Sequence, residues 1–329
     1  MMDKSEIFKK IQKYTEDNPL FFIGSGASAA YGLPGMGILG DHLLSSLSSK
    51  YKTNDDWQRF EDNLKSGKDL ETAMTDIVFK EEIIDDIRKE TWKLISEKDL
   101  AVFSDVVFNN KEIALSKLIK LYCQSHPQKV DIITTNYDRL IEYACDKARL
   151  TLNDGFSGHY TKHYSDSFAK KNAVNLVKVH GSLEWFKDGK GLITTLPLQK
   201  EIPLDLVPEI ITPGVSKYQA VLTGIERSLL SRCDAMIKNA VSYLCIGYGF
   251  NDAQIQALMI QEIQSGKPLV LVTMEVKDDT ARLLENNAMN YAYICKGDKE
   301  DTTKICINNK IHIVDGTYWT IDGFINIIN

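Results

Sequence analysis

Apolar and polar positions follow two different periods along this chain of 329 residues. Short apolar runs, several of them rich in β-branched residues, occur at 20–23, 130–135, 174–179, 241–246 and 268–273. Continuous runs of this kind are typical of strands that are buried on both faces of a parallel sheet. Helical periods fill the intervals between them, so we predict an α/β fold with a doubly wound, Rossmann-like parallel sheet.

A long helical block separates the first two predicted strands. Between residues 55 and 125 the apolar residues recur at helical spacing, as in Trp57, Phe60 and Leu64. We interpret these stripes as core positions and predict that residues 55–125 form a helical insertion or lid. Residues 1–54 and 126–329 are then predicted to form the Rossmann core.

Two regions in the second half of the chain differ from this pattern. The stretch between the third and fourth predicted strands is irregular and rich in proline, which predicts a smaller appended module or long loops. At the C-terminal end we predict an extended segment over 310–314 and a terminal helix that begins at Thr320. The prolines of the irregular stretch are Pro197, Pro203, Pro208 and Pro213, the last followed by Gly214.

Composition and charge narrow the class of protein. The formal net charge of -6 and the isoelectric point near 5.6 disfavour a surface that neutralises nucleic-acid phosphates, so direct nucleic-acid binding is not expected. Residues 1–14 are charged and helical in period, and they lack the apolar core of a signal peptide. No apolar run approaches the length that spans a bilayer. We therefore expect a cytoplasmic protein without a membrane segment.

The cysteines and histidines do not form a metal-binding pattern. The six cysteines stand far apart and none belongs to a CxxC pair, which disfavours a disulfide framework and a structural zinc module. We expect them to be buried thiols. His159 and His163 have i,i+4 spacing, but the surrounding stretch contains Gly and Ser and is not clearly helical. We therefore predict no metal site.

Four of the predicted strands end in polar or glycine-rich turns. In open α/β sheets, ligands bind outside the carboxyl ends of the strands, so we expect these turns to converge. Glycines after the first strand permit a close backbone approach to a ligand, and a helix that begins there favours a phosphate. An amide, a carboxylate and an imidazole beside them suit a nucleotide substrate better than a redox cofactor. The turns are Gly24-Ser25-Gly26, Asn136-Tyr137-Asp138, His180-Gly181 and Gly247-Tyr248-Gly249.

Three of these turns also have a purely structural explanation. The first is compatible with a tight strand-to-helix turn that binds nothing. Asn136 and Asp138 are compatible with an Asx turn that caps the following helix, and His180 with a hydrogen-bonded core histidine. A dehydrogenase is disfavoured, because the window 45–54, where its second strand and ribose-binding acid should stand, is polar and has no strand-like run.

Taken in order, the segments resemble the signature segments of sirtuins. GSGASAAYGLP at 24–34, TNYD at 135–138 and VHG at 179–181 are similar to GAGxSxxxGIP, TQNxD and HG of that family. GYGFND at 247–252 resembles more specifically the GYSFxD segment of the bacterial sirtuin-like proteins of antiphage defence.

Two departures from the sirtuin pattern disfavour a protein deacylase. Sirtuin deacylases carry two zinc-binding CxxC pairs after HG, and this chain has none. They also follow GIP with an acidic residue, Phe and Arg, whereas Pro34 is followed here by Gly35-Met36-Gly37. The defence branch lacks both features, often carries a helical insertion, and hydrolyses NAD.

The resemblance therefore implies an NAD hydrolase that acts as an antiphage abortive-infection effector. Its activity is expected to be gated by homo-oligomerisation or by a partner such as a HerA-type ATPase. An NAD-dependent protein deacylase and a non-catalytic subunit that binds NAD or ADP-ribose remain as alternatives.

The resemblance also assigns roles to individual residues. It implies that His180 is the general base, that Asn136 positions the ribose or the attacking water, and that Asp138 hydrogen-bonds the nicotinamide carboxamide. NAD is expected as the substrate, with no metal. The residues implied to bind NAD are Gly24, Gly26, Ala27, Ser28, Pro34, Gly181, Gly247, Tyr248, Asn251 and Glu275.

Overall fold

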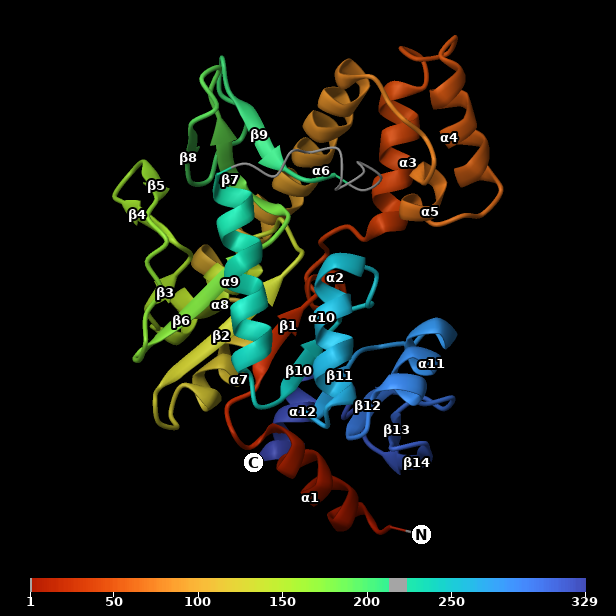
Figure 1. Cartoon of the computed structure of the whole chain (residues 1–329), viewed down its shortest axis with the longest axis vertical. Helices are drawn as coiled ribbons and strands as arrows, with labels where there is room; N and C mark the ends of the chain where they lie inside the picture. The colour runs from red at the N-terminus through yellow and green to blue at the C-terminus, as the bar shows by residue number, and fades with distance from the viewer. Residues whose placement is uncertain (1, 213–223) are drawn as a thin grey trace.

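The computed structural model describes residues 2–212 and 224–329, and over these residues its main sheet has nine strands (Figure 1). From β12 to β3 every neighbouring pair of strands is parallel, whereas the two strands beyond β12 are antiparallel. The predicted doubly wound α/β fold is thus confirmed. In spatial order the strands are β14 (Lys310–Asp315), β13 (Thr302–Ile307), β12 (Tyr291–Lys296), β11 (Leu269–Val272), β10 (Tyr243–Ile246), β1 (Leu20–Ile23), β2 (Lys129–Thr134), β6 (Ala173–Lys178) and β3 (Leu152–Asn153).

The strand order places a switch point between β1 and β10. Reading outward from β1, the chain first adds β2 and β6 on one side and later adds β10, β11 and β12 on the other. This is the order 3-2-1-4-5-6 of dinucleotide-binding folds, in which the ligand lies in the crevice where the order reverses. The loops that follow β1 and β10 therefore meet at the edge where a ligand is expected.

Helices cover both faces of the sheet because alternate strand residues point to opposite sides. Phe21 belongs to the core on one face and Phe22 to the core on the other. Thr320 caps the terminal helix as predicted, since its hydroxyl accepts a hydrogen bond from the backbone N of Gly323. The first face carries α1 (Lys4–Thr15), α7 (Ala114–Tyr122), α8 (Leu140–Ala148) and α12 (Ile321–Ile328), and the second carries α9 (Ile225–Asn239), α10 (Ala253–Gln264) and α11 (Asp278–Asn287).

The helical block that follows the first turn packs into two different cores. Its first part has a core of its own, with Leu43, Trp57 and Phe60 fully buried, and we call this part the helical module. Trp92 and Val102, which lie farther along the chain in the long helix α6 (Glu81–Phe108), pack instead against the sheet, as does α7. The packing thus divides the block predicted as one insertion over 55–125, and it adds to the first part residues 36–47, which were predicted to belong to the Rossmann core. The module consists of α3 (Met36–Leu47), α4 (Asp55–Lys65), α5 (Leu70–Met74) and the first turns of α6 (Glu81–Phe108) (Figure 1).

A second, antiparallel sheet of five strands is formed by the described residues between β3 and α9. Three of its strands lie in the irregular region for which a smaller module or long loops were predicted, and the other two precede the third predicted strand. Pro213 and Gly214 of that prediction lie outside the described residues. The strands of this sheet, in spatial order, are β4 (Phe156–Gly158), β5 (Lys162–Tyr164), β8 (Ile193–Thr195), β7 (Gly181–Lys187) and β9 (Val207–Ile210).

Two further expectations concern the whole chain. All six cysteines are buried and their thiols are free. Among the helices in the described part of the chain, none combines the length and the apolar character that crossing a bilayer requires.

Candidate functional site

The loops after β1 and β10 pack backbone against backbone at the switch point. A Cβ atom on Gly24 would lie 2.4 Å from the carbonyl oxygen of Gly247, and one on Gly26 would lie 2.8 Å from the Gly247 Cα. Gly247 itself has φ of +56°, which favours glycine. The backbone N of Gly26 donates a hydrogen bond to the Gly247 carbonyl at 3.0 Å. Contact between the two loops therefore explains all three glycines, and their contact with a ligand stays a prediction.

A buried polar cluster joins the ends of β1 and β2. The short helix α2 (Ser25–Ala29) begins directly after Gly24 and carries Ser28. The Nδ2 of Asn136 donates to the hydroxyl oxygen of Ser28 at 3.1 Å, and Ser28 also hydrogen-bonds Asp138. The three residues are between 2% and 8% exposed. The structure thus brings together three side chains that the sequence assigned to one site.

Asp138 combines this contact with a capping role. Its Oδ1 accepts a hydrogen bond from the backbone N of Leu140, the first residue of α8, at 3.1 Å. The Asx-turn explanation of the motif is therefore correct for Asp138. This capping hydrogen bond is compatible with the contact of Asp138 with Ser28. Burial raises the pKa of Asp138 to about 6, although the positive charge of Lys178 opposes the shift.

Replacement of Asp138 by Asn should remove a pH dependence of stability. The folded protein holds the proton of Asp138 up to about pH 6, whereas the ordinary value is 3.8, so this group stabilises the folded state at low pH. The free energy of unfolding of the wild type relative to Asp138→Asn should fall between pH 4 and pH 6, by up to about 3 kcal/mol. Urea unfolding at several pH values measures it, and a constant difference would contradict the raised pKa.

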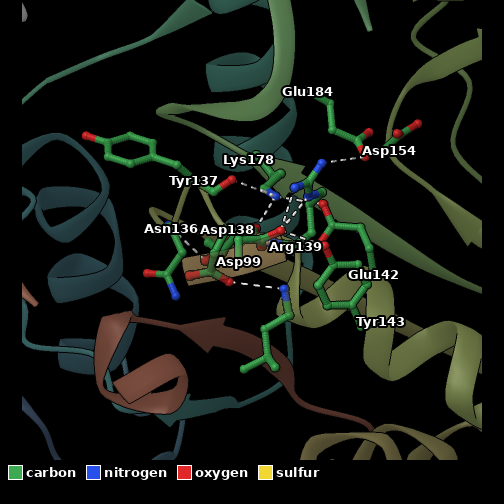
Figure 2. Close-up of polar contacts among 12 residues, drawn as sticks. Asp99, Asn136, Tyr137, Asp138, Arg139, Glu142, Tyr143, Asp154, Lys178 and Glu184 are labelled. Atoms are coloured by element: carbon green, nitrogen blue, oxygen red, sulfur yellow. Dashed lines mark hydrogen bonds and ion pairs between the residues drawn. The ribbon is translucent and has the colours of Figure 1, made fainter. Parts of the chain in front are cut away.

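Beneath the 136–139 turn lies a buried charge network (Figure 2). Asp99 of α6 accepts hydrogen bonds from the backbone N, the Nε and the Nη2 of Arg139 at 2.7, 2.8 and 2.6 Å. It also accepts one from the hydroxyl of Tyr143. Lys178 of β6 donates to the carbonyl oxygen of Asp138 at 2.5 Å and to Glu142 at 2.6 Å. Helix α6, through Asp99, and strand β6, through Lys178, therefore both fix the backbone that presents Asn136 and Asp138.

Sequence reasoning did not find this network. Asp99 and Arg139 are 40 residues apart, and nothing in the local pattern of either segment points to the other. A usable signal was Lys178, a charged residue within a predicted strand that is apolar except for Asn175. A buried lysine needs partners, so it indicates a polar group nearby.

His180 pairs with a carboxylate at the same edge of the sheet. Its Nε2 lies 2.6 Å from the Oδ2 of Asp252, which is 5% exposed. Thr134 of β2 and Lys178 of β6 are partners in the register of the sheet. Asn136 and His180 each follow these partners by two residues, so both lie beyond the same edge of the sheet. Asp252 was not among the predicted site residues, although it ends the 247–252 segment that carries the family resemblance.

The remaining predicted residues differ in their exposure. Tyr248 is buried against Phe22 and Phe250, and within the described structure its hydroxyl has no hydrogen-bond partner. A Cβ on Gly181 would lie 2.1 Å from the carbonyl oxygen of Glu209, so its approach to β9 explains this glycine. Ligand contact of these residues, too, stays a prediction. Ala27 is buried, Pro34 is partly exposed, and Asn251 and Glu275 are exposed.

The helical module contributes charge to the site. The carboxylate of Glu71, in α5, contributes to the raised pKa of both Tyr137 and Tyr248, for which burial is the main cause. Asp69, directly before α5, interacts electrostatically with Lys277, which follows β11. The module therefore acts electrostatically on residues that follow three strands of the main sheet.

The two histidines considered for a metal lie elsewhere. His159 and His163 are both exposed in the β4–β5 hairpin, not on a helix. Over residues 2–212 and 224–329 there is no group of three or more His, Cys, Asp or Glu side chains that could hold a metal ion.

Comparison with known proteins finds one matching family model. Residues 130–293 match the family model of the SIR2-like domain. A solved SIR2 homolog in complex with NAD is similar over 89% of this chain and 88% of its own, with 13% identity and a TM-score of 0.46. A sirtuin structure solved for the basis of substrate affinity is similar over 88% of this chain and 93% of its own, with 14% identity and a TM-score of 0.47. No curated protein matches the sequence.

The family match covers four of the polar residues at the sheet edge, whereas Ser28 and the glycine loop after β1 precede it. Asn136, Asp138, His180 and Asp252 all lie within it. The resemblance to sirtuins is thus confirmed at the level of a domain. The segment that presents this amide, these carboxylates and this imidazole at the sheet edge is the part of the chain, residues 130–293, that matches the SIR2-like domain.

Proposed function

We propose that the protein hydrolyses NAD to nicotinamide and ADP-ribose. The observation that carries the proposal is the position of the His180–Asp252 pair and the Asn136–Ser28–Asp138 cluster at the carboxyl edge of a sheet in dinucleotide-binding order. The SIR2-like match over residues 130–293 supports NAD-dependent activity of the sirtuin kind.

The proposed reaction breaks the bond between the ribose anomeric carbon and the nicotinamide nitrogen. Nicotinamide leaves with the bonding electron pair, a water oxygen binds the anomeric carbon, and one proton of that water is released. The transition state has oxocarbenium character, so the site must orient the ribose and stabilise positive charge. With Nε2 of His180 directed at Asp252, Nδ1 serves as acceptor for a proton from water or a ribose hydroxyl. Asn136 orients the ribose or water, and Asp138 the carboxamide.

Incubation of the full chain with NAD, with and without an acyl-lysine peptide, tests this proposal. We expect equal amounts of nicotinamide and ADP-ribose without the peptide. Asn136→Ala should reduce the rate by about 10²–10³-fold, because an orienting group of the transition state is lost. Asn287→Ala, on the outer helix α11, is the matched control and should retain wild-type activity.

Two other outcomes of this assay would refute NAD hydrolysis. Turnover only in the presence of the peptide, with transfer of its acyl group to ADP-ribose, would identify a deacylase. Binding of NAD or ADP-ribose without any product would identify a non-catalytic binding subunit.

We further propose that the activity serves antiphage defence as an abortive-infection effector. Unrestrained NAD hydrolysis would be toxic to the cell that makes the protein, so the activity has to be gated. Homo-oligomerisation or a HerA-type ATPase partner would supply the gate. The same NAD assay on size-exclusion fractions, with and without that partner, tests the gating, and a monomer that is fully active alone would contradict it.

A further inference from the structure

We infer that Asp252 is the positioning residue of His180 and selects the imidazole tautomer that carries its proton on Nε2. The Nε2 of His180 lies 2.6 Å from the Oδ2 of Asp252, the distance of a short, charge-assisted hydrogen bond. A carboxylate accepts only, so the ring must donate through Nε2, and Nδ1 remains as the proton acceptor. The catalytic consequence of this inference rests on the proposed function.

The backbone around His180 is fixed by other contacts. Its carbonyl oxygen accepts a hydrogen bond from Ile211 at 2.9 Å, and the neighbouring N of Val179 donates to Thr134 at 3.1 Å. These contacts hold the corner between β6 and β7 but do not set the rotation of the imidazole. The Asp252 carboxylate, 5% exposed and therefore little screened by water, is placed to set it.

Asp252 also has a structural role, which must be separated from this one. Its Oδ1 lies 3.4 Å from the backbone N of Ile255, and its carbonyl oxygen accepts from Gln256 at 2.9 Å, as expected of a residue that caps α10. The two carboxylate oxygens thus have different partners, and the contact with His180 is the shorter. Asn and Ser cap helices about as well as Asp, so they can keep the cap while removing the negative charge.

Asp252→Asn and Asp252→Ser therefore test the inference. We expect each to lower kcat for NAD by about 10²-fold or more, with the KM and the melting temperature close to the wild-type values. Asp3→Asn, which changes the capping residue of α1 far from the site, is the matched control and should retain wild-type kcat. Asp252→Glu should restore part of the activity, because it restores the charge.

A spectroscopic measurement separates positioning from a merely structural role. In protein labelled with ¹⁵N-histidine, the signal lost in His180→Gln identifies His180 among the six histidines. We expect this signal to report a proton on Nε2 in the wild type and a shift toward the Nδ1-protonated form in Asp252→Asn.

Each result of these experiments has a definite meaning. An unchanged tautomer in Asp252→Asn, or an unchanged kcat in both capping variants, would overturn the inference. If the wild type does not cleave NAD but the tautomer changes as expected, the proposed function fails while the assignment of Asp252 stands.

Discussion

His180→Ala is expected to lower the rate of NAD hydrolysis by about 10²–10⁴-fold, the usual contribution of a general base. The substitution removes the Nδ1 acceptor and leaves the carboxylate of Asp252 without its imidazole partner. His180→Gln is the sharper variant, because its amide can still donate to Asp252 while it cannot take up a proton. We expect it to be equally inactive and to retain the wild-type free energy of unfolding. Nicotinamide release measures the rate, and urea unfolding measures the stability.

His163→Gln is the control for this substitution. His163 is exposed on β5 of the second sheet, so its replacement should leave both the rate and the stability unchanged. Wild-type turnover in His180→Gln would remove the general-base assignment.

Asp99→Ala should lower the free energy of unfolding by about 3–5 kcal/mol, the largest loss of stability among the proposed variants. Asp99 is 0% exposed and Arg139 2% exposed, so the substitution leaves a buried guanidinium without its main partner. It also frees the backbone N of Arg139 and the hydroxyl of Tyr143, both bonded to the same carboxylate. Urea or thermal unfolding of the full chain measures the effect.

An exposed ion pair at the C-terminal end of α6 provides the control. Asp105 pairs with Lys111 at 3.1 Å, and both side chains are more than 40% exposed, so Asp105→Ala should destabilise the protein far less than Asp99→Ala. The double variant Asp99→Leu with Arg139→Met removes both charges and should be more stable than Asp99→Ala. Equal losses in Asp99→Ala and Asp105→Ala would contradict the role of the buried network.

Features that depend on neighbouring residues could be predicted from the sequence. The strand Leu20–Ile23 and the helix start at Thr320 follow from local periodicity and capping, and the structure has both. The convergence of Asn136, Asp138 and Ser28 followed from one rule, that parallel strands share a carboxyl edge.

Features that depend on tertiary packing could not be predicted in this way. The apolar stripes of α4 and of the second half of α6 look alike in sequence, yet one faces the core of the module and the other faces the sheet. The hairpin of β12 and β13 was missed, because an antiparallel addition to a parallel sheet has no period of its own. The pairing of Asp252 with His180 joins two segments that only the fold brings together.

The contact between the glycine loops has a consequence for any shortened form of the protein. Gly24 and Gly247 lie so close together that a side chain on either would collide with the backbone of the other. The switch point is therefore formed jointly by the loop after β1 and the loop after β10. A fragment that ends before β10 would contain the Gly24 loop but lack the Gly247 loop against which it packs. We expect such a fragment to bind a dinucleotide only after the complementary fragment has been added and the contact between the two loops has formed.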